Sequence, residues 1–472
     1  MSDLYIKVKS AGTDEWERPD DWLAMPSVTS ADDTFVGLHT VFPTGSNFVA
    51  FRFTTDTGDY QVDWGDGNVD VVASNTDAQH QYDFTNVALD GTLTSEGYKQ
   101  AIITVTPVSG ELRTANFQRR YPTTPTISIS YITGFLDCIL SMPNANTGQS
   151  ITFGGTITPH RLCQRVDIKT IGNATSMLNM FIGCFSLQSL PLFDTSNVTN
   201  MSSMFQACIS LKSIPFFNTS NVTNMSSMFE ACYSLQTIPL LDTSSATSMS
   251  ELFFGCRSLE TIPLIDTSNI TTMLRFFSGC QSLQTIPLLN TSNVTNMLEI
   301  FSGCFSLESI PLLDTSNVTN MGSMFSDCDS LKTIPPLDTS SATLMRRMFY
   351  VNNVIHTVPL LDTSNVTDMF EMFRGCSALQ EAPAFDTTSV TNQSNQFYAC
   401  YSLTKTNIVC RKSISFREAL LSQSELVNIF NNLIDLTGLT SQNINITSCW
   451  GASALTAGER QIATDKNWTI TG

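Results

Sequence analysis

The fold is decided by a stretch that recurs every 24 residues, and one copy reads Thr195-Ser-Asn-Val-Thr-Asn-Met-Ser-Ser-Met-Phe-Gln-Ala-Cys-Ile-Ser-Leu-Lys-Ser-Ile-Pro-Phe-Phe-Asn218. A unit this short cannot close a hydrophobic core by itself, so neighbouring copies have to stack. The sequence therefore predicts a solenoid of ten coils over residues 171–406. One phenylalanine per copy establishes the period: Phe181, Phe205, Phe229, Phe253, Phe277, Phe301, Phe325, Phe349, Phe373 and Phe397.

Each copy carries apolar residues at a spacing typical of a helix. In the first copy these are Met177, Met180, Phe181 and Cys184, which stand at i, i+3, i+4 and i+7. Ser or Thr upstream can cap such a helix, and the segment from Ser186 to the following proline has the character of a short strand. The sequence thus predicts an α/β solenoid whose coils form a parallel sheet on one side and short helices on the other.

A cysteine stands at the same place in nine of the copies. Stacked coils lie only about 4.8 Å apart, which brings disulfides into consideration. An odd-numbered ladder has no consistent pairing, however, and a disulfide demands a specific dihedral angle. We therefore expect buried free thiols in a protein made in a reducing compartment. The column consists of Cys184, Cys208, Cys232, Cys256, Cys280, Cys304, Cys328, Cys376 and Cys400.

A second column holds aspartate or asparagine and is always followed by threonine. Stacked carboxylates repel one another unless something compensates, so a row of calcium ions is one interpretation. The asparagines favour another, in which any oxygen acceptor closes an Asx-turn onto the following amides. We expect no cofactor, and calcium stays the alternative. The column consists of Asp194, Asn218, Asp242, Asp266, Asn290, Asp314, Asp338, Asp362 and Asp386.

Variable positions beside these columns are the candidates for ligand binding. The residue after each cysteine is often aromatic, and aromatic rings stack on sugar faces while amides bridge sugar hydroxyl groups. The eighth copy departs from the consensus, which marks either relaxed packing or a local site. An ordinary uncharged protein surface is the alternative interpretation. The predicted ligand-binding residues are Phe185, Tyr233, Arg257, Phe305 and Tyr401 after the cysteines, and Arg346, Arg347, Tyr350 and His356 in the eighth copy.

The composition argues against several classes of function. The formal net charge is −18 and only 14% of the residues are charged, so the clustered Lys and Arg that bind nucleic acids and anionic membranes are missing. The start, Met1-Ser-Asp-Leu-Tyr, shows no basic leader followed by an apolar run, so we expect no export by a standard signal, and no apolar run is long enough to span a membrane. Only four histidines occur, and no nucleophile motif accompanies them. We expect no enzyme, no nucleic-acid partner and no membrane insertion.

The segments that flank the repeats are predicted to form separate domains. Antiparallel alternation with turns at Asp56-Thr-Gly-Asp59 and Gly65-Asp-Gly67 predicts a β-sandwich. The first residues form either a docking segment or a terminus strapped onto the protein. The predicted domains are an N-terminal arm at 1–43, the β-sandwich at 44–107, a β connector and N-terminal cap at 108–170, the repeats at 171–406, and an α/β C-terminal cap at 407–472.

One turn of the β-sandwich carries a recognisable motif. The run Val62-Asp-Trp-Gly-Asp-Gly-Asn68, with His80-Gln-Tyr82 later, resembles the polycystic-kidney-disease-type domain. The hallmark of that domain is a W-G-D-G turn followed by an H-x-Y strand, and the resemblance implies a spacer or ligand presenter in surface proteins. We interpret Asp63 and Asp66 as turn residues rather than calcium ligands.

The repeat consensus T-S-N-V-T-N-M-x-x-M-F-x-x-C-x-S-L-x-x-I-P resembles BspA-type leucine-rich repeats. Such repeats occur in bacterial surface proteins and in bacteriophage structural proteins. Together with the segment Glu17-Arg-Pro-Asp-Asp-Trp-Leu23, the W-G-D-G domain and the ending Ile462-Ala-Thr-Asp-Lys-Asn-Trp-Thr-Ile-Thr-Gly472, they make the chain similar to fibre-like proteins of marine phages, particularly cyanophages. The resemblance implies adhesion and no catalytic residues.

The expected function is therefore that of a bacteriophage virion appendage, such as a tail fibre, assembled in the host cytoplasm. Its repeats would bind a glycan or protein of the host cell surface, and its N-terminal region would contact other virion proteins. The alternatives are a non-adhesive structural or decoration protein of the virion and a bacterial surface adhesin. A homo-oligomer is compatible with all three, although no coiled-coil heptads enforce one.

Overall fold

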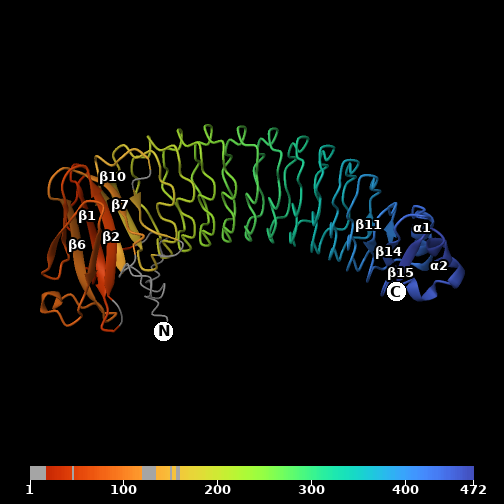
Figure 1. The fold of residues 1–472 in the computed structure, drawn as a ribbon, viewed down its shortest axis with the longest axis horizontal. Coiled ribbons are helices and arrows are strands. Elements are labelled where there is room, and N and C mark those ends of the chain that lie inside the picture. The colour runs from red at the N-terminus through yellow and green to blue at the C-terminus, as the bar shows by residue number, and fades with distance from the viewer. Residues whose placement is uncertain (1–16, 45–46, 120–133, 149–150, 156–159) are drawn as a thin grey trace. The chain divides into compact units, whose positions relative to one another are not determined.

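A computed structural model describes residues 17–44, 47–119, 134–148, 151–155 and 160–472, and Figure 1 shows its ribbon. The protein divides into two compact units. One comprises Met1–Val222 and Cys232–Leu241, and the other comprises Thr223–Ala231 and Asp242–Gly472. The division falls within the repeats, so each unit contains part of the solenoid. Residues 120–133 of the predicted β connector lie outside the described residues.

Two β-sheets form the N-terminal part of the first unit. The larger has the strand order β10-β8-β1-β6-β3-β4, and the smaller has the order β5-β2-β7-β9. The ring of Phe35 in the larger sheet lies 6.0 to 6.2 Å from the rings of Phe51 and Phe53 in the smaller one, so the sheets share an aromatic core. The strands are β1 (Thr34–Val41), β2 (Phe48–Thr55), β3 (Tyr60–Asp63), β4 (Val69–Val72), β5 (Asp77–Gln81), β6 (Lys99–Pro107), β7 (Leu112–Asn116), β8 (Phe135–Ser141), β9 (Ile151–Thr152) and β10 (Arg165–Thr170), and a 3-10 helix spans Val87–Leu89.

The sheets extend beyond the limits 44–107 that the sequence assigned to the β domain. β1, from the predicted arm, pairs with β6 on one side and β8 on the other, and it is buried along its whole length. Upstream of it, Arg18 Nε donates to Asp137 at 3.0 Å and Trp22 Nε1 donates to the Tyr98 hydroxyl at 3.1 Å. The described part of the arm is thus strapped onto the sheet, as one of the two interpretations proposed. Docking to another protein stays a prediction.

The prediction of a short helix in every copy is wrong. Across residues 171–406, all of which are described, the backbone has no helix, and Figure 1 shows this segment as open loops. In the first copy two consecutive turns replace the helix, closed by the amide of Met180 on the carbonyl of Met177 and by the amide of Cys184 on the carbonyl of Phe181. A pair of such turns directs the same four side chains inward as two helical turns would, so the apolar spacing does not distinguish them.

Hydrogen bonds that a helix would make internally go to the next coil instead. In most of the turn segments every second amide donates to a carbonyl of the following coil, as in parallel strand pairing. The amides of Met297, Glu299, Phe301 and Gly303, for example, reach the carbonyls of Asn320, Gly322, Met324 and Ser326 at 2.8 to 3.2 Å. The continuous parallel sheet predicted from the sequence is reduced to isolated bridges such as Asn296 with Asn320 and to one short pair, β11 (Glu381–Ala382) with β12 (Lys405–Thr406).

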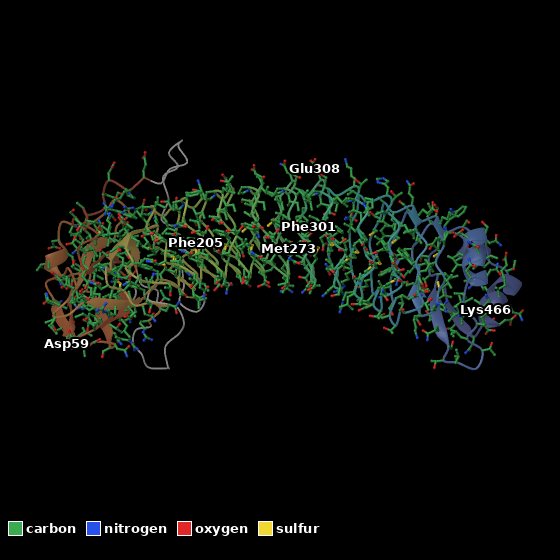
Figure 2. All side chains as sticks on the ribbon, turned by 90° about the horizontal axis from the view of Figure 1, so that it is seen from above. Asp59, Phe205, Met273, Phe301, Glu308 and Lys466 are labelled. Carbon is green, nitrogen blue, oxygen red and sulfur yellow. The ribbon has the colours of Figure 1, made fainter. Side chains whose placement is uncertain are left out.

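The interior columns predicted from the sequence are confirmed. Met273, Phe277 and Cys280 are fully buried, and Figure 2 shows Met273 and Phe301 inside the coils and Glu308 at their margin. Rings of the phenylalanine column stack at 5.2 to 5.9 Å through the second unit. The described cysteines are all free and buried, as expected. The Cys280 thiol donates to the carbonyl of Phe253 in the preceding coil at 3.1 Å.

Mixed α/β structure follows the last repeat. Three short parallel strands, β13 (Ile414–Ser415), β14 (Gln442–Asn445) and β15 (Trp468–Thr471), form one sheet. The helices are α1 (Gln423–Asn431) and α2 (Ala457–Thr464), with a 3-10 turn at Ala452–Ala454. A capping box between Thr456 and Glu459 opens α2. None of the described helices combines the length and the apolar character that crossing a membrane requires.

Candidate ligand-binding surface

Arginines and aromatic rings alternate across the last three coils of the second unit and the first row of the C-terminal cap. The guanidinium groups of Arg347 and Arg374 lie over the ring of Tyr350, 5.4 and 5.8 Å from its centroid. Tyr398 receives Arg374 and Arg417 at 4.9 and 5.3 Å. We call this set the arginine–aromatic array, and it consists of Arg346, Arg347, Tyr350, Phe370, Arg374, Tyr398 and Arg417.

The third ring of the array contacts both arginines of the eighth copy. Arg346 and Arg347 lie 5.7 and 5.4 Å from the centroid of Phe370. Guanidinium groups that stack on ring faces keep their N–H donors in the guanidinium plane, where they point past the ring toward solvent. Arg346, Arg347 and Tyr350 were predicted from the irregularity of one copy, and the structure brings these three together.

One buried carboxylate orients the centre of the array. Glu371 accepts hydrogen bonds from Arg347 Nε at 2.8 Å and from Arg374 Nη1. Its side chain is 3% exposed, whereas those of Arg347 and Arg374 are 42% and 35% exposed. Burial would raise the pKa of Glu371, but the bonds from the two arginines outweigh burial and lower that pKa. The carboxylate therefore stays ionised beneath guanidinium groups that face solvent.

The backbone fixes the spacing of these side chains. Amides of Arg347 and Val351 donate to the carbonyls of Phe370 and Arg374, and the Gly375 amide donates to the carbonyl of Tyr398, all at 2.8 Å. Arg347 and Glu371 occupy the same left-handed position of successive coils, with φ of 55° and 53°. At this position the Arg347 side chain is partly exposed, whereas that of Glu371 is buried. The residues of the array belong to the turn segments, and we call this side of the coils the turn face.

Two unfavourable features coincide with the array in the eighth copy. Val351 adopts φ 54°, where most other copies carry glycine or alanine, and a β-branched residue in this region is strained. Asn352 is fully buried in the cysteine column, and its Nδ2 has no hydrogen-bond acceptor among the described residues. Both features cost stability at the place where the exposed arginines gather.

The residues predicted after the cysteines do not form one surface. Within the second unit, Arg257, Phe305 and Tyr401 are exposed, as they were expected to be. Phe305 stands two coils from Arg257 and four from Tyr401, with polar residues in between. In the first unit Phe185 is half-buried and Tyr233 is exposed. Each occupies a separate position along its unit, and their role in binding stays a prediction.

His356 stands apart from the other candidates of the eighth copy. It is exposed at the strand position, where the Gln380 amide donates to its carbonyl at 3.2 Å. Among the described residues no contact joins it to Arg346, Arg347 or Tyr350. The structure thus separates the four residues that the sequence grouped by their place in one copy.

The aspartate column consists of Asx-turns, as the sequence predicted. Asp314 Oδ1 accepts from the amide and hydroxyl of Ser316 at 3.1 and 2.7 Å, and these bonds lower the pKa of Asp314. Asn290 accepts from the Ser292 amide in the same way at 3.2 Å. No cluster of three metal-ligating side chains occurs in the described part of the chain. Whether calcium binds there is a matter for titration.

The sequence did not predict two features: a row of exposed apolar side chains near the aspartate column, and the residues that the ninth and tenth copies supply to the array. In the second unit a row of apolar side chains, 62 to 73% exposed, follows the prolines: Leu264, Leu288, Leu312 and Leu360. Next to its last member, a cavity of about 460 Å³ is lined by Asp338, Asp362 and Asp386. The sequence analysis also missed Phe370, Arg374 and Tyr398 of the array, because they belong to copies that follow the consensus. The signal that could have found them is variability from copy to copy at two positions, one directly after the methionine and one directly after the phenylalanine.

The W-G-D-G turn and the H-x-Y strand meet in the first unit. The rings of Trp64 and His80 stack at 4.8 Å, and His80 Nε2 lies 2.8 Å from Asp66 Oδ2. The Tyr82 hydroxyl donates to the carbonyl of Trp64 at 2.8 Å. Asp66 also accepts from the Asn68 amide, which is the turn role predicted for it. The kinship with polycystic-kidney-disease-type domains stays a resemblance.

Comparison with solved structures finds proteins to which parts of this chain are similar, among them the following three. A leucine-rich cell surface protein from Faecalibacterium prausnitzii A2-165 is 16% identical, with a TM-score of 0.37 over 75% of this chain and 94% of that one. A leucine-rich-repeat protein from Eubacterium ventriosum ATCC 27560 is 15% identical, with a TM-score of 0.33 over 61% and 93%. The plant peptide hormone receptor RGFR1 in complex with RGF2 is 13% identical, with a TM-score of 0.23 over 71% and 59%.

The family assignment comes from the repeats themselves. Among curated proteins none matches the chain. Residues 161–263, 247–359 and 332–412 match the family described as "Mycoplasma protein of unknown function, DUF285". These matches together span residues 161–412, more than half of the 472 residues. The chain therefore belongs to the DUF285 family, and its repeats are BspA-type leucine-rich repeats.

Proposed function

We propose that the protein is a non-catalytic recognition protein that binds a glycan or protein of a bacterial cell surface through its repeats. The observation that carries the proposal is the contrast between the inside and the outside of the coils. Interior positions such as Phe277 and Cys280 repeat with little change, while the outward positions on the turn face differ from copy to copy. A rigid scaffold that carries variable exposed side chains is typical of solenoids that bind partners.

The environments of the histidines support a non-catalytic role. His39 and His160 are buried, and burial lowers their pKa values to about 3 and about 4. His80 is paired with Asp66 inside the W-G-D-G network. His356 is exposed on the strand side, and no contact to a nucleophilic side chain is found for it among the described residues. None of the four is placed as a general base beside a nucleophile.

The location we propose is a bacteriophage virion appendage, and it rests on the resemblance of the whole chain to fibre-like proteins of marine phages. A decoration protein of the virion and a bacterial surface adhesin are the alternatives. Mass spectrometry of purified particles and of bacterial surface fractions separates them, because a virion protein is found in the particles and an adhesin in the surface fraction.

Binding to cells tests the function itself. The full-length protein, fluorescently labelled, is mixed with a panel of bacteria that includes cyanobacteria, and bound protein is measured by flow cytometry. Saturable binding to a narrow set of strains is the expected result. Binding to no strain would refute recognition and favour the decoration role. Release of oligosaccharides from the bound cells would refute the non-catalytic assignment.

A further inference from the structure

We propose that the arginine–aromatic array binds an acidic saccharide, with the guanidinium groups on its carboxylate or sulfate groups and the aromatic rings against its sugar faces. This inference rests on the proposed function and names the ligand class for one site. Its chemistry follows from which donors of the array the protein leaves unused.

The array has more cationic groups than paired anionic partners. Its four arginines face two carboxylates, Glu371 beneath the centre and Glu418, which accepts from Arg417 Nε at 3.1 Å. Two other carboxylates on nearby turns are engaged elsewhere. Asp327 accepts from the Ser326 hydroxyl at 2.6 Å, and Asp368 accepts from the Phe370 amide at 2.9 Å. The pairing therefore leaves two guanidinium charges of the array without a carboxylate.

Hydrogen-bond donors of the array are also unused. Arg347 and Arg417 each donate to a carboxylate through Nε alone. For the Arg346 guanidinium the structure gives a ring contact and, within the described residues, no acceptor. The Nη atoms of the first two arginines and the whole fork of Arg346 are therefore available to a ligand. Such forks bind carboxylate and sulfate oxygens in pairs, which gives geometric selectivity as well as affinity.

The rings of the array favour a sugar over a bare anion. Tyr350, Phe370 and Tyr398 are each half-buried, so part of every ring remains open to solvent beside a guanidinium group. The hydroxyls of both tyrosines have no hydrogen-bond partner among the described residues. Aromatic faces next to hydroxyls and cations match a pyranose ring that carries an acidic substituent.

The dimensions suit an extended chain of sugars. Arg347 and Arg374 stand on adjacent rows, Tyr398 stands on the next row and Arg417 on the row after that, and backbone hydrogen bonds join these rows. At about 4.8 Å per row, the four rows from the eighth copy to Arg417 extend over about 14 Å. A short acidic oligosaccharide that runs along the rows would meet arginines on the first, second and fourth rows and the ring of Tyr398 on the third.

Another arginine on the same turn face shows the contrast. Arg275 lies over the ring of Phe254 at 5.8 Å, as in the array. It stands between two carboxylates, however, with Glu299 at 2.6 Å and Glu251 at 3.4 Å. Its charge is therefore already compensated, which makes Arg275 a matched control for the array.

The strain in the eighth copy supports a binding role independently. A left-handed Val351 and an unpaired Asn352 amide both weaken the coil that supplies Arg346, Arg347 and Tyr350. Strained positions of this kind cluster at functional sites. The strain does not identify a ligand, but it marks the same coil that the unused donors mark.

The test uses the full chain and measures affinity by biolayer interferometry. Immobilised probes are oligogalacturonate, its neutral methyl ester, sialyllactose, a sulfated galactan oligosaccharide, an acidic peptide and single-stranded DNA. We expect at least one acidic saccharide to bind with an affinity that falls with salt, and the methyl ester to bind at least about 10-fold more weakly than oligogalacturonate if the carboxylate probe is the one recognised. Carboxylate and sulfate probes distinguish the two sources of acidic groups.

Variants locate the binding. The double variant Arg346→Gln/Arg417→Gln, which keeps Glu371 paired, is expected to lose at least about 10-fold in affinity. The control Arg275→Gln should bind like the unmodified protein. Amide exchange of the coils verifies that each variant is folded. The inference is overturned if no acidic saccharide binds, if binding survives the double variant, or if the peptide or DNA binds as tightly as the saccharide.

The two proposals fail separately. If labelled protein binds cells and the double variant binds them equally well, the acidic-saccharide site is refuted while recognition by the repeats stands. If saccharides bind the array but no strain is bound, recognition of a bacterial cell surface is refuted, and the array remains a saccharide site.

Discussion

Replacing Asn352 by cysteine should stabilise the coil that carries the array. In eight of the copies a thiol at this position donates to the carbonyl of the phenylalanine in the preceding coil, at 2.9 to 3.2 Å. Asn352 leaves its Nδ2 unpaired in the same buried column. An unpaired buried donor costs about 1–3 kcal/mol. The variant removes this cost with little change in side-chain volume.

One favourable contact is lost in exchange. Asn352 Oδ1 accepts from the Ile355 amide at 3.2 Å, and such a bond contributes about 0.5–1.5 kcal/mol. The corresponding amide in the preceding coil, Leu331, donates to the carbonyl of Cys328 at 3.2 Å instead, and Ile355 can do likewise in the variant. The net gain is therefore about 1 kcal/mol, equivalent to roughly a 5-fold decrease in the opening constant of this coil.

Hydrogen exchange followed by mass spectrometry measures this local opening. Under reducing conditions, exchange of the Arg347, Phe349 and Val351 amides, which bond to the next coil, should slow about 5-fold in Asn352→Cys. The reverse change in the neighbouring coil, Cys328→Asn, is the matched control and should speed up exchange. Unchanged or faster exchange in Asn352→Cys, beside a destabilised Cys328→Asn, would refute the hydrogen-bond reasoning.

Three further outcomes follow from the structure. Val351→Gly should raise the free energy of unfolding by about 1 kcal/mol in urea titrations, because glycine adopts φ 54° without strain whereas valine is strained there. A loss of stability would contradict the strain argument. Asp314→Asn should change the free energy of unfolding by less than about 0.5 kcal/mol at pH 7, because asparagine can keep the Asx-turn, whereas Asp314→Ala should lower it by about 1 kcal/mol. Calcium titration monitored by thermal unfolding should not separate these variants. Burial lowers the pKa of His39 to about 3, so the unfolded state binds more protons than the folded state between pH 6.5 and about 3. The N-terminal sheets should therefore lose stability as pH falls through that window. In His39→Gln the slope of stability against pH should be smaller, and an equal slope would assign the effect to other groups.

Much of the solenoid follows from the sequence because the period aligns residues of like kind. Phe277, Cys280 and Leu283 are fully buried, as the recurrence of their residue types from copy to copy predicts. The helix prediction failed because inward-facing positions at i, i+3, i+4 and i+7 fit two consecutive turns as well as two turns of a helix. A signal against the helix was present in Gly279 and its equivalents, because glycine at a regular place inside a short helix is unfavourable. At Gly279 the structure has φ 75°.

The candidate site was predictable only in part, because it is made between copies rather than within one. Arg346, Arg347 and Tyr350 stood out as departures from the consensus. Their partners Arg374 and Tyr398 become visible only when the coil register is known, since each lies one coil further along. The place of β1 in the larger sheet was missed for a related reason. Its partners β6 and β8 are distant in sequence, and pairing of that kind leaves no local pattern.

The ladder of amides that reach carbonyls of the following coil has a consequence for how such proteins change over generations. Most coils present the same donors to the next coil and the same acceptors to the one before. Inserting or deleting one whole coil therefore restores all bonds at the joint, whereas inserting a few residues breaks them. Recombination between neighbouring copies in the gene can lengthen or shorten the protein in steps of one whole coil without a folding penalty at the seam, and it can move the exposed residues of one coil along the chain together.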